Sequence, residues 1–229
     1  MNQKYEKISE IVKKELSCSA HDLEHVLRVY KLCLYLAKYE PLVNMDVLKT
    51  ATLLHDIAKV KEDQDNSGNT DHALLGAEMA KTILEELGYI EDLDQVIHCI
   101  RTHRFRGGNR PTTLEAKILF DSDKIDILGA IGIARSYMIA GQYKQSIYAD
   151  VSIDDYIRDN LMGANPKGRI KNISKHSPNL EFEIKIKRIP ENLFTEKAKE
   201  VARKRIEFMQ TFFDRLKNDI KGEKYIYRI

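Results

Sequence analysis

Three widely separated segments of this sequence place histidine and aspartate among regularly spaced apolar residues. They contain His25, the adjacent pair His55 and Asp56, and Asp123. The apolar spacing predicts a helix around each of them, and neighbouring helix positions point about 100° apart. Adjacent histidine and aspartate side chains can therefore both face inward only at a crowded centre. A divalent metal ion is the simplest partner that offsets their burial, so we expect these side chains to converge on one.

Apolar periodicity in the first two thirds of the chain predicts successive amphipathic helices. Residues 47–58 form an unusually apolar stripe, which predicts a buried central helix that includes His55. The polar segment 61–71 predicts a loop. A single long helix is expected over residues 114–141, with Thr113 as its N-cap.

The pattern changes after residue 141. Residues 142–176 show no sustained period, which predicts an irregular excursion with short helical pieces, either a lid or a packing strap. Residues 180–187 fit both a strand and a helical stripe, and Ser177 followed by Pro178 favours the helix. Thr195 is the expected cap of a last long helix.

Taken together, these segments predict an all-α fold. We expect a helical core over residues 1–141 and a C-terminal helical extension over residues 142–229. The extension is expected to pack on the core, so that the chain forms a single structural domain of ordinary size.

Charge and cysteine content limit the class of protein. Charged residues make up 31% of the 229 residues and the net charge is +2, so there is no global bias toward nucleic acid. No apolar run approaches the roughly 18 residues of a membrane span. The charged N-terminal segment is not typical of a signal peptide. Three unevenly spaced cysteines (Cys18, Cys33 and Cys99) argue against disulfides and favour a cytoplasmic location.

Three motifs in order resemble a known family. They are HDLEHVLRV at 21–29, LLHDIAK at 53–59 and FDSDKIDILGAIGIAR at 120–135. This His…His-Asp…Asp order resembles the HD-domain metal-dependent phosphohydrolases, in particular a small stand-alone branch. That branch includes manganese-dependent nucleotide pyrophosphohydrolases and many proteins of unassigned substrate. With a further pattern from Thr195 to Met209, the resemblance covers nearly the whole chain.

The resemblance implies an HD-domain helical bundle and a hydrolase. His25, His55, Asp56 and Asp123 would hold one divalent cation, such as manganese, iron, magnesium, nickel or cobalt. A metal-activated water would attack a small phosphorylated substrate, best represented by a nucleotide cleaved to a monophosphate and pyrophosphate. Asp56 or a nearby histidine would accept the proton.

His72 and His103 each stand at an expected helix boundary. Some HD-domain phosphodiesterases use two further histidines at comparable places to hold a second metal. Two interpretations are therefore open: a second cation, or histidines that contact phosphate or act as acid or base. The sequence favours one cation with histidine-assisted substrate binding.

Several further side chains have both a functional and a structural interpretation. Lys59 would hold a phosphate oxygen or the leaving group, or else be a solvated lysine at a helix end. His21 would lie behind His25 or contact substrate, or else cap its helix. Arg28 would reach an anionic substrate or brace a carboxylate. The expected catalytic residues are Asp56, Lys59, His72 and His103, and the expected substrate-binding residues are His21, Arg28, Arg104 and Asp126.

Asp126 lies one helical turn after Asp123. It would orient a ligating histidine, a role that metal sites generally need. The alternative is a surface carboxylate paired with Lys124 or Arg135, and the sequence does not separate the two.

The loop after His103 is rich in arginine and glycine. Its positive charge and accessible backbone amides favour a phosphorylated small molecule. Nucleic acid is less favoured because Phe105 is the single aromatic residue of this segment. The arginines are Arg101, Arg104, Arg106 and Arg110.

Two other classes of function stay open: a non-catalytic nucleotide sensor with a structural metal, and a di-iron oxygenase on the same fold. Residues 142–176 would either close over substrate or form a homodimer.

Overall fold

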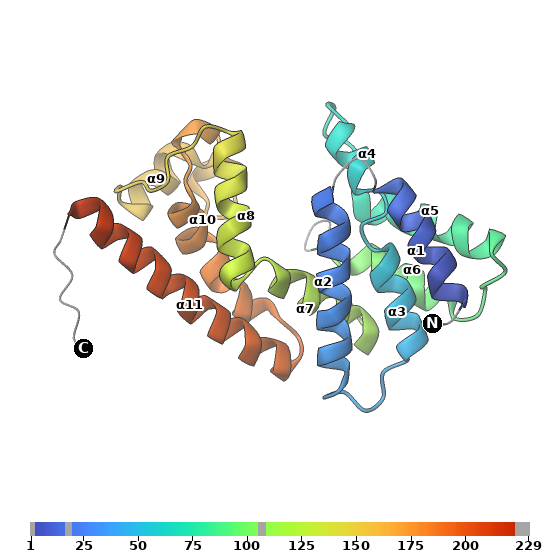
Figure 1. Ribbon diagram of the computed structural model, residues 1–229. Helices are drawn as coiled ribbons and strands as arrows, with labels where there is room; N and C mark the ends of the chain where they lie inside the picture. Colours follow the sequence, from blue (N-terminus) through green and yellow to red (C-terminus); the bar gives the residue numbers. More distant parts are fainter. Residues whose placement is uncertain (1–2, 17–19, 105–108, 223–229) are drawn as a thin grey trace. The chain divides into compact units, whose positions relative to one another are not determined.

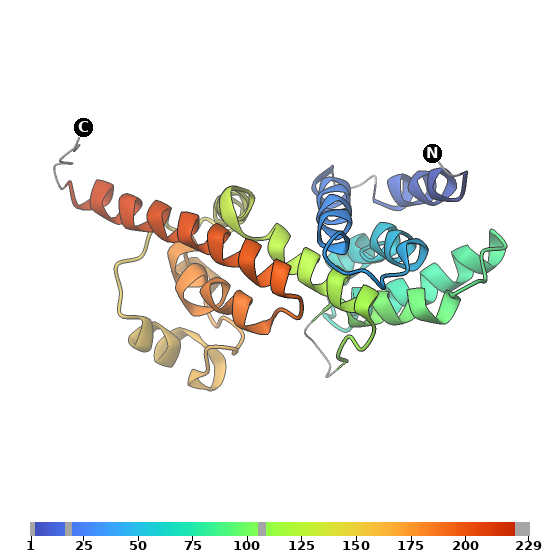
Figure 2. The same ribbon diagram turned by 90° about the horizontal axis from the view of Figure 1, so that it is seen from below.

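The computed structural model describes residues 3–16, 20–104 and 109–222, with residues 20–22 described by their backbone alone. The described chain contains no strand beyond an isolated antiparallel bridge between Leu161 and Ile170. The prediction of an all-α fold is confirmed (Figures 1 and 2). The helices are α1 (Gln3–Glu15), α2 (Ala20–Ala37), α3 (Met45–Leu54), α4 (Lys59–Gln64), α5 (His72–Glu86), α6 (Leu93–Thr102), α7 (Leu114–Asp126), α8 (Gly129–Gln142), α9 (Ile153–Asn160), η1 (Met162–Ala164), η2 (Ile173–Lys175), α10 (Pro178–Ile184), η3 (Ile186–Asn192) and α11 (Glu196–Lys221).

The chain forms two compact units. The first contains residues 1–126 and 193–198, and the second contains residues 127–192 and 199–229. The division falls at 126/127, whereas the sequence suggested 141/142. That the extension packs on the core as one structural domain stays a prediction.

The expected single helix over 114–141 is wrong, because the chain breaks between α7 and α8. Gly129 starts α8 with a φ of +73°, a conformation that costs glycine little. Gly132 lies so close to the carbonyl of Ile127 that a Cβ there would be 2.1 Å from the oxygen. These two glycines therefore mark the boundary between α7 and α8.

The expected helix over 47–58 is also shorter than predicted. α3 ends at Leu54, and residues 55–58 form a tight turn in which the amide of Lys59 donates to the carbonyl of Asp56 at 2.8 Å. The polar segment 61–71 is not all loop, because its first four residues complete α4. The sequence predicted too long a helix because Ile57 and Ala58 are buried in the turn, and buried apolar residues there continue the apolar pattern of α3.

The first unit is built around α3, whose residues from Thr50 to Leu54 are all buried. α2, α6 and α7 each pack against α3, while α5 packs along α6 (Figure 1). Burial of apolar side chains on these facing helices supplies the core, at roughly 25 cal/mol per Å². Its largest fully buried members include Leu36, Leu48, Leu54, Ile57, Ile100, Ile118 and Leu119.

A fully buried carboxylate fastens residues 193–198 to this unit. Asp121 on α7 accepts hydrogen bonds from the backbone amides of Phe194 and Thr195, at 2.9 and 2.8 Å. It also accepts from the Thr195 hydroxyl at 2.8 Å. α11 begins at the next residue, as predicted.

The second unit packs α8, α9 and α10 around aromatic and aliphatic side chains. Phe182 of α10 lies against Phe213 of α11, with ring centroids 5.0 Å apart. Tyr156 and Leu180 are the centre of a smaller cluster. The helix predicted after Ser177 is confirmed as α10, although the Ser177 hydroxyl makes no cap hydrogen bond. The predicted excursion is confirmed too, with α9, η1 and η2 as its helical pieces.

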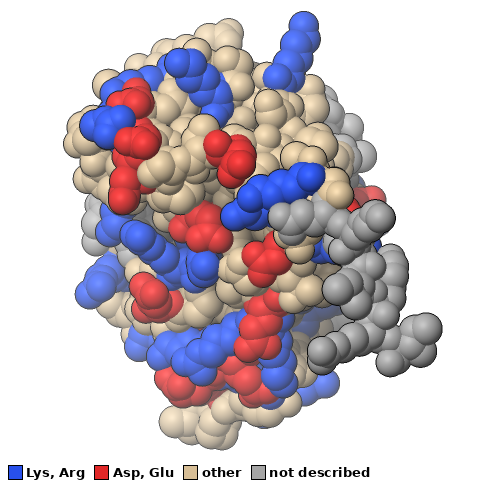
Figure 3. All heavy atoms as spheres, turned by 90° about the vertical axis from the view of Figure 1, so that its left-hand side faces the viewer, with Lys and Arg blue, Asp and Glu red and all other residues tan. Residues whose placement is uncertain are grey.

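Basic and acidic side chains are interspersed over the face drawn in Figure 3. Pairs spaced four residues apart on one helix, such as Lys187 with Glu183 and Lys204 with Glu200, contribute to this mixed surface. Cys33 and Cys99 are free and buried, and burial raises the pKa of each thiol to about 12. Among the described residues, no helix is both long and apolar enough to cross a membrane.

We expect Asp121→Ala to lower the free energy of unfolding by about 3 kcal/mol, because two buried donors and one partly buried donor lose a charged acceptor. Urea unfolding followed by circular dichroism measures the change. Asp219→Ala removes an exposed carboxylate that pairs with Arg215, and it is the matched control with an expected loss below about 0.5 kcal/mol. Equal losses in the two variants would contradict the role of Asp121.

Candidate metal centre

One group of side chains gathers at the centre of the first unit from three elements. His25 comes from α2, His55 follows the last residue of α3, and Asp123 comes from α7. The ligand atoms of these three residues lie within 4.8 Å of one another. His25 Nε2 is 3.1 Å from an Asp123 carboxylate oxygen. The predicted convergence of these segments is present in the structure.

A second group joins Asp56 to the two additional histidines. His72 is the first residue of α5, and His103 follows the last residue of α6. Their Nε2 atoms lie 3.1 and 3.4 Å from Asp56 Oδ1, and 3.1 Å from each other.

Asp56 lies between the two groups. Its Oδ1 faces His72 and His103, whereas its Oδ2 lies 3.5 Å from His25 Nε2 and 3.7 Å from His55 Nε2. Asp56 is buried in the turn that separates α3 from α4. His55 keeps helical backbone angles as the C-cap of α3, Asp56 lies in the turn that follows, and both side chains face the centre.

Each of the four histidines directs its Nδ1 atom at an oxygen acceptor. A carboxylate or carbonyl accepts only from a protonated nitrogen, so Nδ1 carries a proton and Nε2 is the atom that faces the centre. A cation that binds there would displace any proton on Nε2 and take its lone pair. The acceptors are Asp126 for His25 at 2.8 Å, the Thr52 carbonyl for His55 at 2.7 Å, Glu62 for His72 at 2.7 Å, and the Ile100 carbonyl for His103 at 2.6 Å.

The donor set fits a cation. The Nε2 atom of His55 is fully buried and has no hydrogen-bond partner. The Nε2 atoms of His72 and His103 lie 3.1 Å apart and both face Asp56 Oδ1, so one bound cation could take a lone pair from each. Imidazole nitrogens with carboxylate oxygens suit borderline to hard divalent ions.

Burial and charge separate the pKa values of the two histidines in the first group. Burial alone lowers the pKa of His25, but hydrogen bonds to Asp123 and Asp126 outweigh it and raise the pKa to about 10. Burial lowers the pKa of His55 to about 4. Burial would raise the pKa of Asp56, but its histidine neighbours hold it well below its usual value. The centre thus concentrates negative charge that favours a cation.

Asp126 orients His25. It is buried, and besides His25 Nδ1 it accepts two hydrogen bonds from the Arg28 guanidinium, at 2.8 and 3.0 Å. Burial would raise the pKa of Asp126, but these partners lower it to about 2. Because Asp126 is buried, the alternative of a surface carboxylate is wrong. This arrangement also favours the bracing role of Arg28, and substrate contact by either residue stays a prediction.

Glu62 on α4 is a member of the site that the sequence did not indicate. Its carboxylate accepts hydrogen bonds from His72 Nδ1, from Lys59 at 3.0 Å and from Arg104 at 2.6 Å. Burial would raise the pKa of Glu62, but His72 and the cations lower it to about 2. Because α4 was predicted as loop, Glu62 had no expected face, and no spacing rule connects it to His72.

The cationic side chains near the centre are partly accounted for. Lys59 begins α4, so its interpretation as a lysine at a helix end is wrong, and it pairs with Glu62 and Asp63. Lys124 lies 2.7 Å from Asp123 Oδ2, a contact that the sequence analysis missed. The His21 side chain and Arg106 lie outside the described residues, while Arg101 and Arg110 are exposed.

These helices and histidine–aspartate groups define a metal-binding bundle, and comparison with known proteins names its family. The HD domain family matches residues 22–128. Residues 22–128 therefore form an HD domain, and the similar crystal structures support membership of the HD-domain phosphohydrolase superfamily.

Individual relatives agree with this assignment. The uncharacterized protein YpgQ of Bacillus subtilis (strain 168) is 29% identical over 208 residues, which cover 89% of this chain and 86% of YpgQ. An HD-superfamily hydrolase from Bacillus thuringiensis has a similar crystal structure, with a TM-score of 0.70, 26% identity, and coverage of 96% of this chain and 98% of the other. A crystal structure of Bacillus subtilis YpgQ in complex with ADP matches with a TM-score of 0.68 and 27% identity, over 96% of each chain.

We expect Asp126→Asn to weaken Mn²⁺ binding about 10- to 100-fold, because the amide no longer holds His25 as a charged acceptor does. Isothermal titration of chelator-treated protein gives the affinity. Asp154→Asn changes an exposed aspartate of α9 in the second unit and is expected to leave the affinity unchanged. An affinity of Asp126→Asn equal to that of the wild type would contradict the orienting role.

Proposed function

We propose that this protein is a metal-dependent phosphohydrolase that cleaves a nucleotide to a monophosphate and pyrophosphate. Membership of the HD-domain superfamily supports hydrolase chemistry. The nucleotide rests on two weaker supports, which are the ADP complex of the related YpgQ and the cationic side chains beside the metal centre.

The observation that carries this proposal is the shared direction of the four histidine Nε2 atoms. All four lone pairs converge where Asp56 contributes one carboxylate oxygen to each group. Such convergence is costly in a buried site unless cations offset it. A structural histidine has no reason to leave its second nitrogen unpartnered, as His55 does.

We assign a first cation to His25, His55, Asp56 and Asp123. The grouping of Asp56 with His72 and His103 leads us to propose a second cation, although the sequence favoured one. When bound, such cations lower the pKa of a coordinated water and polarise a phosphoryl oxygen. The Nε2 atoms of His72 and His103 both face Asp56 Oδ1, so in this proposal the two histidines are ligands of the second cation.

Charged side chains around the groups have separate tasks. Lys59 and Arg104 are held by Glu62, which places two positive charges next to His72. These charges, together with Lys124 beside Asp123, would offset the negative charge of a phosphorylated substrate. The low pKa of Asp56 suits a ligand better than a proton acceptor, so the proton-accepting role of Asp56 stays a prediction.

We expect His55→Ala and Asp123→Ala each to reduce nucleotide hydrolysis at least about 1000-fold, because each loses a ligand. Release of monophosphate and pyrophosphate from a panel of nucleotides with Mn²⁺, Mg²⁺, Ni²⁺ or Co²⁺ measures the effect. His98→Ala, which removes a histidine of α6 that contacts Thr112, is the matched control. Binding of nucleotides by the wild type without product, seen as a thermal shift alone, would identify a sensor instead of an enzyme.

The number of cations is tested separately. Titration of chelator-treated wild type with Mn²⁺ is expected to saturate at two ions per chain, and His103→Ala at one, because the second group loses a ligand. Circular dichroism confirms that His103→Ala is folded. Saturation of the wild type at one ion would remove the second site from the proposal and leave the hydrolase intact.

A further inference from the structure

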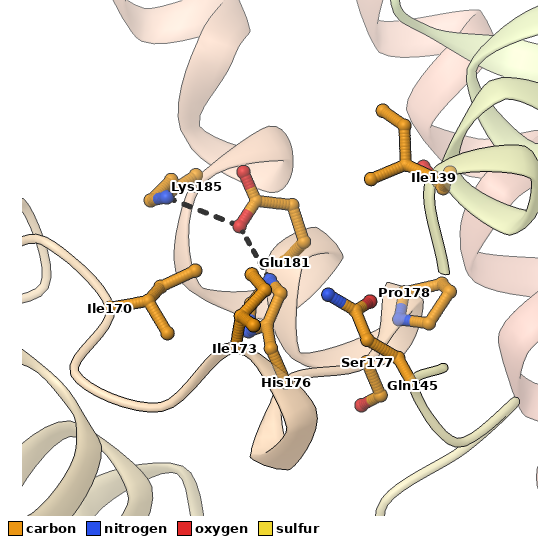
Figure 4. A pocket seen from close by; sticks show the side chains of 10 residues that line it. Ile139, Gln145, Ile170, Ile173, His176, Ser177, Pro178, Glu181 and Lys185 are labelled. Carbon is orange, nitrogen blue, oxygen red and sulfur yellow. Dashed lines mark hydrogen bonds and ion pairs between the residues drawn. The ribbon is translucent and has the colours of Figure 1, made fainter. Parts of the chain in front are cut away.

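A pocket of about 190 Å³ lies within the second unit, and none of its lining residues is assigned to the metal centre (Figure 4). The C-terminal half of α8, the segment that follows it, residues 170–178 and the exposed side of α10 form its walls. Isoleucine and proline side chains provide most of the lining, namely Ile139, Ile170, Ile173 and Pro178.

The size of the pocket limits what it can hold. An engineered apolar cavity of about 150 Å³ in another protein binds benzene, whereas pockets for drug-sized ligands occupy roughly 300 to 1000 Å³. A volume of about 190 Å³ therefore suits one small ring and is too small to enclose a whole nucleotide.

A chain of buried hydrogen bonds fixes the polar wall. Asn160 donates to the Tyr156 hydroxyl at 3.0 Å, and that hydroxyl lies 2.7 Å from His176 Nδ1. His176 Nε2 lies 2.9 Å from Glu181 Oε2. Because the tyrosine oxygen already accepts from Asn160, its hydroxyl donates to Nδ1, and Nε2 donates to Glu181. Both nitrogens of His176 are used, so His176 presents no group to a ligand.

The charges of this wall balance. Burial would raise the pKa of Glu181, but His176 and Lys185 lower it, so the carboxylate is ionised. The Lys185 ammonium lies 3.2 Å from the same Oε2 atom. The lining therefore carries no net formal charge, and a phosphate or free carboxylate would gain no counterion there.

Two groups remain for a ligand. The Nε2 atom of Gln145 is buried in the wall and has no hydrogen-bond partner. In the view of Figure 4, its amide lies between the His176–Glu181 pair and Pro178. His176 and Lys185 both contact Oε2 of Glu181, so Oε1 stays available as an acceptor. The pocket thus offers one donor and one acceptor between apolar walls.

We propose that this pocket binds a small, uncharged, planar ring that carries a cyclic amide, such as a free pyrimidine base. The ring carbonyl would accept from Gln145 Nε2, the ring N–H would donate to Glu181 Oε1, and the ring faces would pack on the isoleucines. A buried donor that lacks a partner is destabilising, so a ligand that accepts a hydrogen bond from Gln145 Nε2 gains affinity directly. The site is independent of the hydrolytic reaction.

Uracil is the probe. We expect it to bind the full chain at millimolar concentration, as seen by saturation-transfer NMR and quantified by isothermal titration. Gln145→Leu should weaken binding about tenfold, the equivalent of one hydrogen bond. Gln142→Leu makes the same change at an exposed position of α8 and should bind uracil as the wild type does. Absence of uracil binding to the wild type would overturn the proposal.

Two further arms identify the site and its chemistry. 1,3-Dimethyluracil keeps the ring and carbonyls but has no N–H, so it should bind at least about tenfold more weakly. Equal binding would show a merely apolar cavity and overturn the cyclic-amide assignment. Uracil should bind His55→Ala, and chelator-treated wild type, with unchanged affinity. Loss of binding in either would place the ring at the metal centre and overturn the proposal, whether or not nucleotides are hydrolysed.

Discussion

The direction of four histidine rings determines what the first unit can do. Each ring is anchored through Nδ1 to an oxygen, so its Nε2 lone pair is aimed and cannot turn away. Two of the anchors are backbone carbonyls three residues earlier, those of Thr52 for His55 and Ile100 for His103. Both histidines follow the last residue of a helix, where carbonyls lack helical partners. In both cases the hydrogen bond from Nδ1 satisfies a carbonyl at the end of the helix and also orients the histidine ring.

The other two anchors are carboxylates, and each extends the centre outward. Asp126 connects His25 to Arg28, and Glu62 connects His72 to Lys59 and Arg104. Each carboxylate is kept ionised by its cations, as the lowered pKa values show. The cationic side chains thus keep ionised the carboxylates that hold the histidine rings. They also add positive charge near the expected position of the phosphate. The rigid centre and the charged periphery form one network.

Much of this arrangement could be predicted from the sequence, for a physical reason. Apolar periodicity and capping residues identify helices, and the residues that suit metal coordination, His25, His55, Asp56 and Asp123, stand out on buried faces. The breaks at 55–58 and 127–128 could not be predicted, because buried residues in a turn preserve the apolar pattern of a helix. Glu62 was missed for a different reason, because its polar segment predicted a loop where the structure has α4. Contacts across a turn follow from three-dimensional packing, which periodicity does not describe.

The position of Asp126 has a consequence for the tolerance of this fold to change. Asp126 is the final residue of α7, and the chain leaves the first unit directly after it. Helix ends fray more readily than helix centres. The double hydrogen bond from Arg28 restrains this end, so a distant helix keeps the last turn of α7 wound. The junction at 127–128 therefore has to preserve the position of Asp126 at the end of α7, or the orientation of the His25 ring is lost.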